Sequence, residues 1–177
     1  MSPRHPEHLQ NFDYVGRYRY SLRFSTHARQ LRFADSAAVE LVLSHCAQQA
    51  SDEQFAIVVY CFMPDHVHLL IEGLADSSDC KRFIGRAKQF SGFYFSQQFG
   101  TRLWQRYGYE RTLRDDEATL VMARYILANP VRAGLVSRVE DYPFVGSLVY
   151  SLNELLEGVT TPGTTLEVAS GRKDSIG

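Results

Sequence analysis

The chain has 177 residues, 45% of them hydrophobic, and a formal net charge of -1. This composition fits one globular domain with enough apolar material for a core. No run of about 18 apolar residues occurs, which excludes a transmembrane helix, and the first residues lack the apolar region of a signal peptide. Cys46, Cys61 and Cys80 show no C-x-x-C spacing, so we expect free thiols in a cytoplasmic protein without a membrane partner.

The first third of the chain contains one strand and one helix. Residues 1–16 include prolines, and we expect them to form an irregular N-terminal arm. Residues 18–26 alternate in character and are rich in strand-forming side chains, which predicts the first strand. Asp35 and Ser36 can cap a helix that continues to about residue 50.

The next two elements form a hairpin. Residues 55–63 are a near-continuous apolar run, which predicts a central strand. Pro64 and Asp65 mark a short turn, and residues 66–72 predict a further strand. The two strands together are typical of an antiparallel hairpin.

The second half of the chain continues with helix and strand signals. A helix is predicted from Asp79 to about residue 98, and Gly100 ends it. Residues 103–113 are expected to be extended and to supply a fourth strand with an irregular aromatic start. Three acidic residues at 115–117 suit the N-terminus of a third helix, because they complement its dipole.

The end of the third helix and the remaining chain complete the predicted fold. Asn129 precedes Pro130 and is biased away from helical angles, so the helix is expected to end there. The order of elements predicts an α+β, ferredoxin-like (RRM-like) antiparallel sheet with helices on one face and an added C-terminal helix carrying Tyr125. We expect one domain over residues 1–150, with 141–150 packing back on it, and a poorly ordered tail at 151–177.

Two histidines stand two residues apart in the second strand of the hairpin. A strand alternates its side chains between two faces, so His66 and His68 point the same way while Val67 points the opposite way. Neutral imidazole nitrogens are good metal ligands. The pair is therefore a candidate metal site, but two ligands are too few for a stable centre.

The third helix offers groups that complete such a site. Tyr125 and Asn129 are four residues apart and share one helix face. Asn129 can supply a carbonyl oxygen ligand and Tyr125 a phenolic nucleophile, while Asp65 can orient a histidine. Two histidines and an amide oxygen with open positions suit Mg²⁺ or Mn²⁺ bound together with a phosphate.

Each signal also has an ordinary explanation. An isolated H-x-H in a strand is more often non-catalytic, a helical tyrosine is usually a core or surface residue, and Asn before Pro is a common helix stop. Their joint occurrence favours a site, and so does the neighbouring segment 81–114. It holds eight Lys and Arg, a single acid (Glu110) and nine aromatic residues, a composition that favours nucleic-acid contact or a solvated amphipathic helix.

The motifs at 62–71, 103–106, 125–126 and 129–136 resemble those of the single-tyrosine HUH transposases of the IS200/IS605 type. Within that group the chain is most similar to the REP-associated tyrosine transposases. The similarity extends from Phe12 to Ser147, and the motifs occur in the family's order. H-x-H alone is not specific, whereas H-x-H followed by Tyr-x-x-x-Asn-Pro is.

The resemblance implies an enzyme that cleaves and joins single-stranded DNA. It implies that His66 and His68 are metal ligands and that Asn129 matches the third ligand. It also implies that Tyr125 attacks a phosphodiester, giving a 5′-phosphotyrosine link and a free 3′-OH. It further implies that the partner is single-stranded or hairpin DNA, at element ends or in palindromic repeats, bound by a monomer or a homodimer. Candidate DNA-binding residues are Lys81, Arg82, Arg86, Lys88, Trp104 and Arg106. Two roles stay open for Trp104 and Arg106, which either stack bases or are structural.

Other functions remain open at this point. A replication initiator or relaxase-like nickase uses the same chemistry, and a domesticated protein binds hairpins without moving DNA. An RRM-like RNA-binding module is less favoured, because the strand that would display aromatic residues displays His66 and His68. A barrel-type metal hydrolase needs about 250 residues, and a 2H phosphoesterase needs a second H-x-[ST] motif that is missing here.

Overall fold

A five-stranded antiparallel sheet forms the centre of the computed structural model, which describes residues 12–113 and 115–160. Its strands lie in the order β4-β1-β3-β2-β5. The strands are β1 (Arg19–Ser25), β2 (Phe55–Met63), β3 (His66–Gly73), β4 (Tyr109–Leu113) and β5 (Val145–Gly146). The helices are α1 (Ser36–Asp52), α2 (Cys80–Phe99), α3 (Asp116–Arg132) and α4 (Leu152–Thr160).

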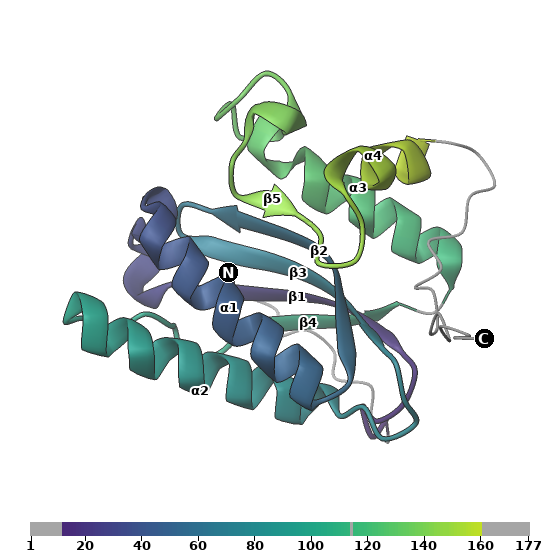
Figure 1. Ribbon diagram of the computed structural model, residues 1–177, viewed down its shortest axis with the longest axis horizontal. Coiled ribbons are helices and arrows are strands. Elements are labelled where there is room, and N and C mark those ends of the chain that lie inside the picture. Colours follow the sequence, from purple (N-terminus) through teal and green to yellow (C-terminus); the bar gives the residue numbers. More distant parts are fainter. Residues whose placement is uncertain (1–11, 114, 161–177) are drawn as a thin grey trace, which may run out of the picture.

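The helices cover the sheet in two layers (Figure 1). Alternate residues of β3 face the two layers because strand side chains alternate. Val67, Leu69 and Ile71 pack in the core shared with α1 and α2, whereas Leu70 packs in the core shared with α3 and α4. His66 and His68 therefore lie on the α3 face of the sheet.

The predicted ferredoxin-like α+β fold is confirmed. Asp35, Asp79 and Asp115 each cap a helix, accepting a hydrogen bond from a backbone N–H of the first turn. Gly100 ends α2 in the left-handed conformation at φ 67°. The fourth strand is shorter than expected and begins at Tyr109. The cysteines are free and buried, and no described helix is long and apolar enough to cross a membrane.

The predicted end of the third helix at Asn129 is wrong. α3 continues through Pro130 to Arg132 and closes with a Schellman motif. Leu135 N donates to the carbonyl of Pro130 (2.9 Å), Gly134 N donates to that of Val131 (2.9 Å), and Gly134 has φ 70°. The local bias against a helix before proline is outweighed because this glycine and the buried face of the helix fix its last turn.

The predicted poorly ordered tail is also wrong for its first part. Leu152–Thr160 form α4, and Leu155 is fully buried against the α3 layer. Residues 1–11 of the predicted arm and 161–177 of the predicted tail lie outside the described residues. The expected packing of 141–150 on the body is confirmed, since Tyr142 Oη donates to the carbonyl of Phe62 (2.6 Å) and Leu148 N to that of Ile57 (3.1 Å).

Candidate active site

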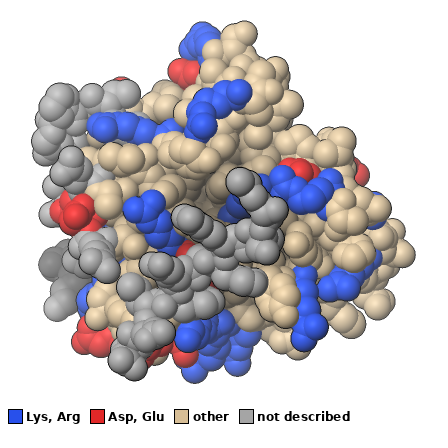
Figure 2. Space-filling view, turned by 180° about the vertical axis from the view of Figure 1, so that it is seen from behind, with Lys and Arg blue, Asp and Glu red and all other residues tan. Residues whose placement is uncertain are grey.

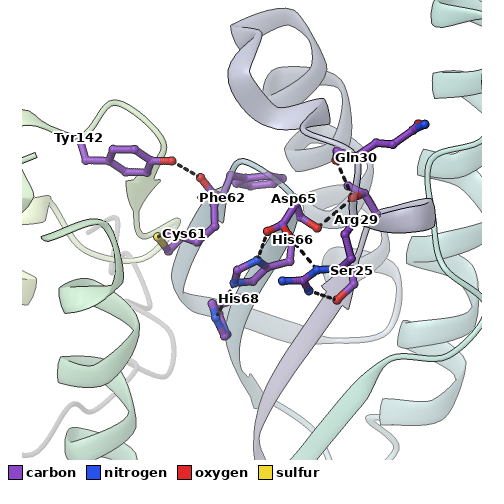
Figure 3. Close-up of polar contacts among 11 residues, drawn as sticks. Ser25, Arg29, Gln30, Cys61, Phe62, Asp65, His66, His68 and Tyr142 are labelled. Carbon is purple, nitrogen blue, oxygen red and sulfur yellow. Dashed lines mark hydrogen bonds and ion pairs between the residues drawn. The ribbon is translucent and has the colours of Figure 1, made fainter. Parts of the chain in front are cut away.

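The two histidines of β3 converge on one point. His66 Nε2 and His68 Nε2 are 3.1 Å apart, and the ring centroids are 4.8 Å apart with an interplanar angle of 82° (Figure 3). His68 is buried (8% exposed), while His66 is partly exposed. The predicted common orientation of the pair is confirmed.

A row of polar contacts fixes the orientation of His66. Its Nδ1 donates to Asp65 Oδ1 (2.6 Å), which leaves Nε2 with a lone pair directed at His68. Asp65 Oδ2 pairs with Arg29 Nε (2.8 Å), and Arg29 Nη1 donates to Ser25 Oγ (2.9 Å). Figure 3 shows Ser25, Arg29, Asp65, His66 and His68 in sequence across the end of the sheet.

Burial lowers the pKa of both imidazoles. For His66 the hydrogen bond with Asp65 acts against this effect, but the pKa still falls below its ordinary value. Burial, with the neighbouring His66 imidazole and the positive charges of Arg23 and Arg29, lowers the pKa of His68 to about 3. Both rings are therefore neutral at physiological pH, the state in which histidine binds a metal.

The carboxylate of Asp65 stays ionised beside them. Burial alone would raise its pKa, but the hydrogen bond and charge of His66 and the charge of Arg29 outweigh burial and lower it. Asp65 thus holds the Nδ1–H tautomer of His66. Such carboxylate–histidine pairs orient metal ligands in many metal sites.

Tyr125 approaches the pair from α3. Its ring centroid lies 6.1 Å from that of His68, with the two planes at 90°. Tyr125 is 44% exposed, and Arg132 Cζ lies 4.7 Å from its ring centroid. Within residues 12–113 and 115–160 its hydroxyl has no hydrogen-bond partner, so the oxygen is available for a bound ligand.

Asn129 has its amide oriented by the proline that follows it. Pro130 has no N–H, so the carbonyl of Ile126 lacks its usual donor four residues later. Asn129 Nδ2 donates to that carbonyl (3.3 Å) and to the carbonyl of Tyr125 (3.0 Å). Because only the nitrogen can donate, Oδ1 is left as the acceptor, and it has no partner in the part of the chain that the structure describes.

The histidine pair fits one shared divalent cation. Two nitrogens each about 2.1 Å from a cation, at right angles, are about 3 Å apart, which agrees with the observed 3.1 Å. No group of three or more His, Cys, Asp and Glu that could hold a metal occurs among the described residues. Among the described residues, the free oxygen of Asn129 has chemistry suitable for a further ligand.

The predicted DNA-binding cations of α2 have intramolecular partners. Arg82 Nε and Arg86 Nη1 pair with the buried carboxylate of Glu53 (2.6 and 3.3 Å). Lys81 Nζ lies 4.6 Å from the ring centroid of Tyr14. Lys88 Nζ donates to the carbonyls of residues 105 and 106 (2.9 and 3.2 Å) and so braces that loop. α2 lies on the face of the sheet opposite the histidines.

Trp104 cannot stack bases, contrary to one of the two predicted roles. It is 6% exposed, its Nε1 donates to Ser91 Oγ (2.9 Å), and its ring packs against Phe24 and Phe33 at 5.8 Å. Its role is structural. Arg106 is exposed, and its Cζ lies 5.6 Å from the ring centroid of Tyr107.

Sequence reasoning missed two arginines of the site. Arg29 holds Asp65, and Arg23 lies opposite His68 in the β1–β3 register. Burial and the charge of Arg29 lower the pKa of Arg23. The alternation in residues 18–26 placed Arg23 on a face of the sheet, but only the strand order reveals that this is the histidine face.

A pocket of about 470 Å³ opens between the β1–β4 side of the sheet and α3. We call it the β1–β4 pocket, and its lining includes Arg23, His68, Tyr109, Arg111, Met122 and Tyr125. Figure 2 shows Lys and Arg side chains around a hollow in the molecule seen from behind. The candidate nucleophile and one candidate ligand thus line the same cavity.

Comparison with known proteins supplies the family. The model of the family described as "Transposase IS200 like" matches residues 14–129. A Haemophilus influenzae protein named "Putative REP-associated tyrosine transposase" is 28% identical over 110 residues, a match that covers 51% of this chain and 57% of that protein. The chain thus spans little more than half the length of this relative.

A solved structure has the same fold. The structure of a REP-associated tyrosine transposase bound to a REP hairpin matches with a TM-score of 0.68 and 18% identity, covering 96% of this chain and 100% of that one. The resemblance expected from the motifs is confirmed, and the region matched by the family model contains His66, His68, Tyr125 and Asn129. The chain therefore belongs to the family of IS200-like transposases.

Proposed function

We propose that the chain is a transposase that cleaves and joins single-stranded DNA at hairpins of palindromic repeats, with Tyr125 as nucleophile. One observation carries this proposal: the ring of Tyr125, from α3, lies 6.1 Å from a histidine pair on β3 whose Nε2 atoms are 3.1 Å apart. Family membership supports the reaction class. The hairpin bound to the solved relative supports the substrate.

The proposed reaction transfers a phosphoryl group to the protein. The Tyr125 oxygen attacks the phosphorus, and the bond from phosphorus to the preceding 3′-oxygen breaks. The phenolic proton is lost, the 3′-oxygen gains a proton, and a 5′-phosphotyrosine bond and a free 3′-OH result. Attack of a 3′-OH on that bond rejoins the DNA and restores the phenol.

The proposed cofactor is Mg²⁺ or Mn²⁺, held by His66, His68 and Asn129. When bound, such a cation polarises the phosphate and stabilises charge on the leaving oxygen. Asp65 keeps His66 in the tautomer that presents Nε2. The low pKa of His68 keeps that ring unprotonated.

The proposed partner is hairpin DNA, bound by a monomer or a homodimer in the cytoplasm. Phosphate contacts come from cations that keep exposed side chains, which include Arg82, Arg86 and Arg106 as well as Lys81. The Lys88 ammonium does not belong to this set, because it already donates to two carbonyls.

A covalent-adduct assay tests the proposed function. The protein is mixed with labelled single-stranded hairpin oligonucleotides, taken from repeats beside its gene, with Mg²⁺ or Mn²⁺, and run on denaturing gels. We expect a labelled protein band that disappears in Tyr125→Phe and in excess chelator. His66→Ala and His68→Ala should reduce the band more than they reduce hairpin binding.

Each other outcome has a definite meaning. An adduct in Tyr125→Phe would remove the tyrosine assignment, and cleavage unchanged by chelator would remove the metal. Hairpin binding without any adduct would indicate a domesticated binding protein. Cleavage without rejoining of a supplied 3′-OH strand would favour a nickase.

A further inference from the structure

The β1–β4 pocket lies beside the candidate active site and has no assigned role. Arg23 on β1 faces His68 on one side and Tyr109 of β4 on the other, because these residues are paired in the sheet register. Tyr125 of α3 also lines the pocket. A group bound there therefore contacts Arg23 and the candidate nucleophile at the same time.

Arg23 differs from the arginines around it. Over the described ranges its guanidinium makes no hydrogen bond or ion pair, and its Nε is buried without a partner. Arg17, Arg19 and Arg29 each pair with a carboxylate. A buried donor without a partner is unfavourable, and most such groups in folded proteins are satisfied. An anion in the pocket would satisfy this one.

The remaining lining suits a nucleotide. Tyr109 is 45% exposed and offers a ring on which a base can stack. Arg111 adds a second guanidinium at the same rim, and Met122 and Val121 form an apolar wall. The volume of about 470 Å³ lies within the range of small-ligand pockets.

We propose that the β1–β4 pocket binds the nucleotide that carries the attacked phosphate of single-stranded DNA. The Arg23 guanidinium contacts a non-bridging oxygen of that phosphate, and the Tyr109 ring stacks on the base. This inference rests on the proposed function and adds the residues that place the phosphate in front of Tyr125. A planar guanidinium matches two phosphate oxygens better than an ammonium does.

Neutral phosphate substitutions test the contact without relying on activity. Hairpin oligonucleotides with one methylphosphonate at each position of the single-stranded extension are bound to the Tyr125→Phe protein and to the Tyr125→Phe, Arg23→Gln protein. In the first protein we expect one position, at the cleavage site, to raise Kd about tenfold. In the protein that also carries Arg23→Gln, a methylphosphonate at that position should not raise Kd further, because the positive charge that contacts this phosphate has already been removed.

The rate of adduct formation provides the second measurement. Arg23→Gln should slow single-turnover adduct formation about 100-fold while the Kd for the hairpin stem changes less than about threefold. Arg23→Lys should recover part of the rate. Arg17→Gln is the matched control, because it removes an exposed arginine that precedes the same strand and pairs with Asp76. Its rate should equal that of the wild type.

Tyr109 is tested with a ring-keeping and a ring-removing change. Tyr109→Phe should bind the extended hairpin like the wild type, whereas Tyr109→Ala should raise Kd about tenfold. Thermal melting of every variant checks folding, and Arg23→Gln should melt no lower than wild type because no partner is left unpaired.

The same measurements distinguish an incorrect role for the pocket from an incorrect reaction class. If wild type and Arg23→Gln form adduct at the same rate and give identical methylphosphonate profiles, the pocket does not hold the phosphate, although the transposase chemistry stands. If the wild type forms no adduct and no methylphosphonate in the extension changes its Kd, the pocket assignment is overturned together with the proposed function. If the position at which a methylphosphonate raises Kd is different in the protein with Arg23→Gln, only the assignment of Arg23 would be overturned.

Discussion

Arg29 and Asp65 form an ion pair that fixes the histidine site, with Arg29 Nε 2.8 Å from Asp65 Oδ2. The other oxygen of Asp65 accepts from His66 (2.6 Å). The backbone that presents Arg29 is unusual, because Ala28 and Arg29 are both left-handed, at φ 52° and 55°. Such conformations are unfavourable for residues with a Cβ and cluster at functional sites.

Removing the charge of Asp65 should weaken metal binding. Asp65→Asn should lower the affinity for Mn²⁺ about 10- to 100-fold, because the amide no longer holds the His66 tautomer as strongly. Arg29→Asn should have a smaller effect in the same direction, since asparagine accepts the left-handed backbone. Isothermal titration with Mn²⁺ measures both. Equal affinity in wild type and Asp65→Asn would show that His66 is oriented by other contacts.

Replacing Pro130 should separate stability from activity. Pro130→Ala restores an N–H donor for the carbonyl of Ile126, so the free energy of unfolding should rise by about 1–3 kcal/mol. The Ile126 carbonyl then no longer needs the hydrogen bond from Asn129 Nδ2, so the Asn129 amide is less firmly oriented and adduct formation should slow about tenfold. Denaturant titration and the adduct assay provide the two measurements, with Val131→Ala as control. A more stable variant with an unchanged rate would mean that Pro130 does not orient Asn129.

The metal-free protein should lose stability as the pH falls below about 6.5. His68 has a pKa of about 3 in the fold and about 6.5 when unfolded. A lowered histidine pKa means that protons bind the unfolded chain more tightly, so this contribution is complete above about pH 6.5 and is lost toward the folded value. One such histidine costs about 2 kcal/mol between about pH 7 and about pH 5.

The pH effect is measured by denaturant titration in the presence of chelator. His68→Gln serves as the control, because its amide does not titrate. In that variant the slope of the unfolding free energy against pH should be smaller by up to about 1.4 kcal/mol per pH unit, which corresponds to one proton. Equal slopes for both proteins would mean that His68 is not held neutral by the fold.

Trp104 should affect stability and leave DNA binding unchanged. Trp104→Ala should lower the free energy of unfolding by about 3–5 kcal/mol, because a buried ring is removed. Trp104→Phe should lower it less, mainly through loss of the hydrogen bond to Ser91. Hairpin affinity is compared at a temperature where each variant is folded, with the exposed Tyr107→Ala alongside. Reduced affinity in a fully stable Trp104→Phe protein would restore a direct role in binding.

The fold and the histidine pair could be predicted because their signals are local. Alternation placed His66 and His68 on one face, and the caps Asp35, Asp79 and Asp115 marked three helix starts. Local rules failed where distant contacts decide. Pro130 predicts a helix stop, but the hydrogen bonds of Gly134 and Leu135 extend the helix beyond it.

The arginines of the site could not be found from sequence patterns. Arg23 reaches His68 only through the pairing of β1 with β3, and Arg29 reaches Asp65 through a loop with two left-handed residues. Trp104 was a possible stacking residue because its segment mixes exposed cations with aromatic residues. Composition alone does not separate a buried ring from an exposed one.

The hairpin that carries the histidines is tied to the segment after β1 by backbone hydrogen bonds. Thr26 N donates to the carbonyl of Asp65 (2.9 Å), and Phe33 N donates to that of Pro64 (3.0 Å). These two amide protons exchange with solvent only when that segment separates from the turn beside His66. Their exchange rates therefore report directly on how long the histidine pair keeps its geometry in the absence of DNA.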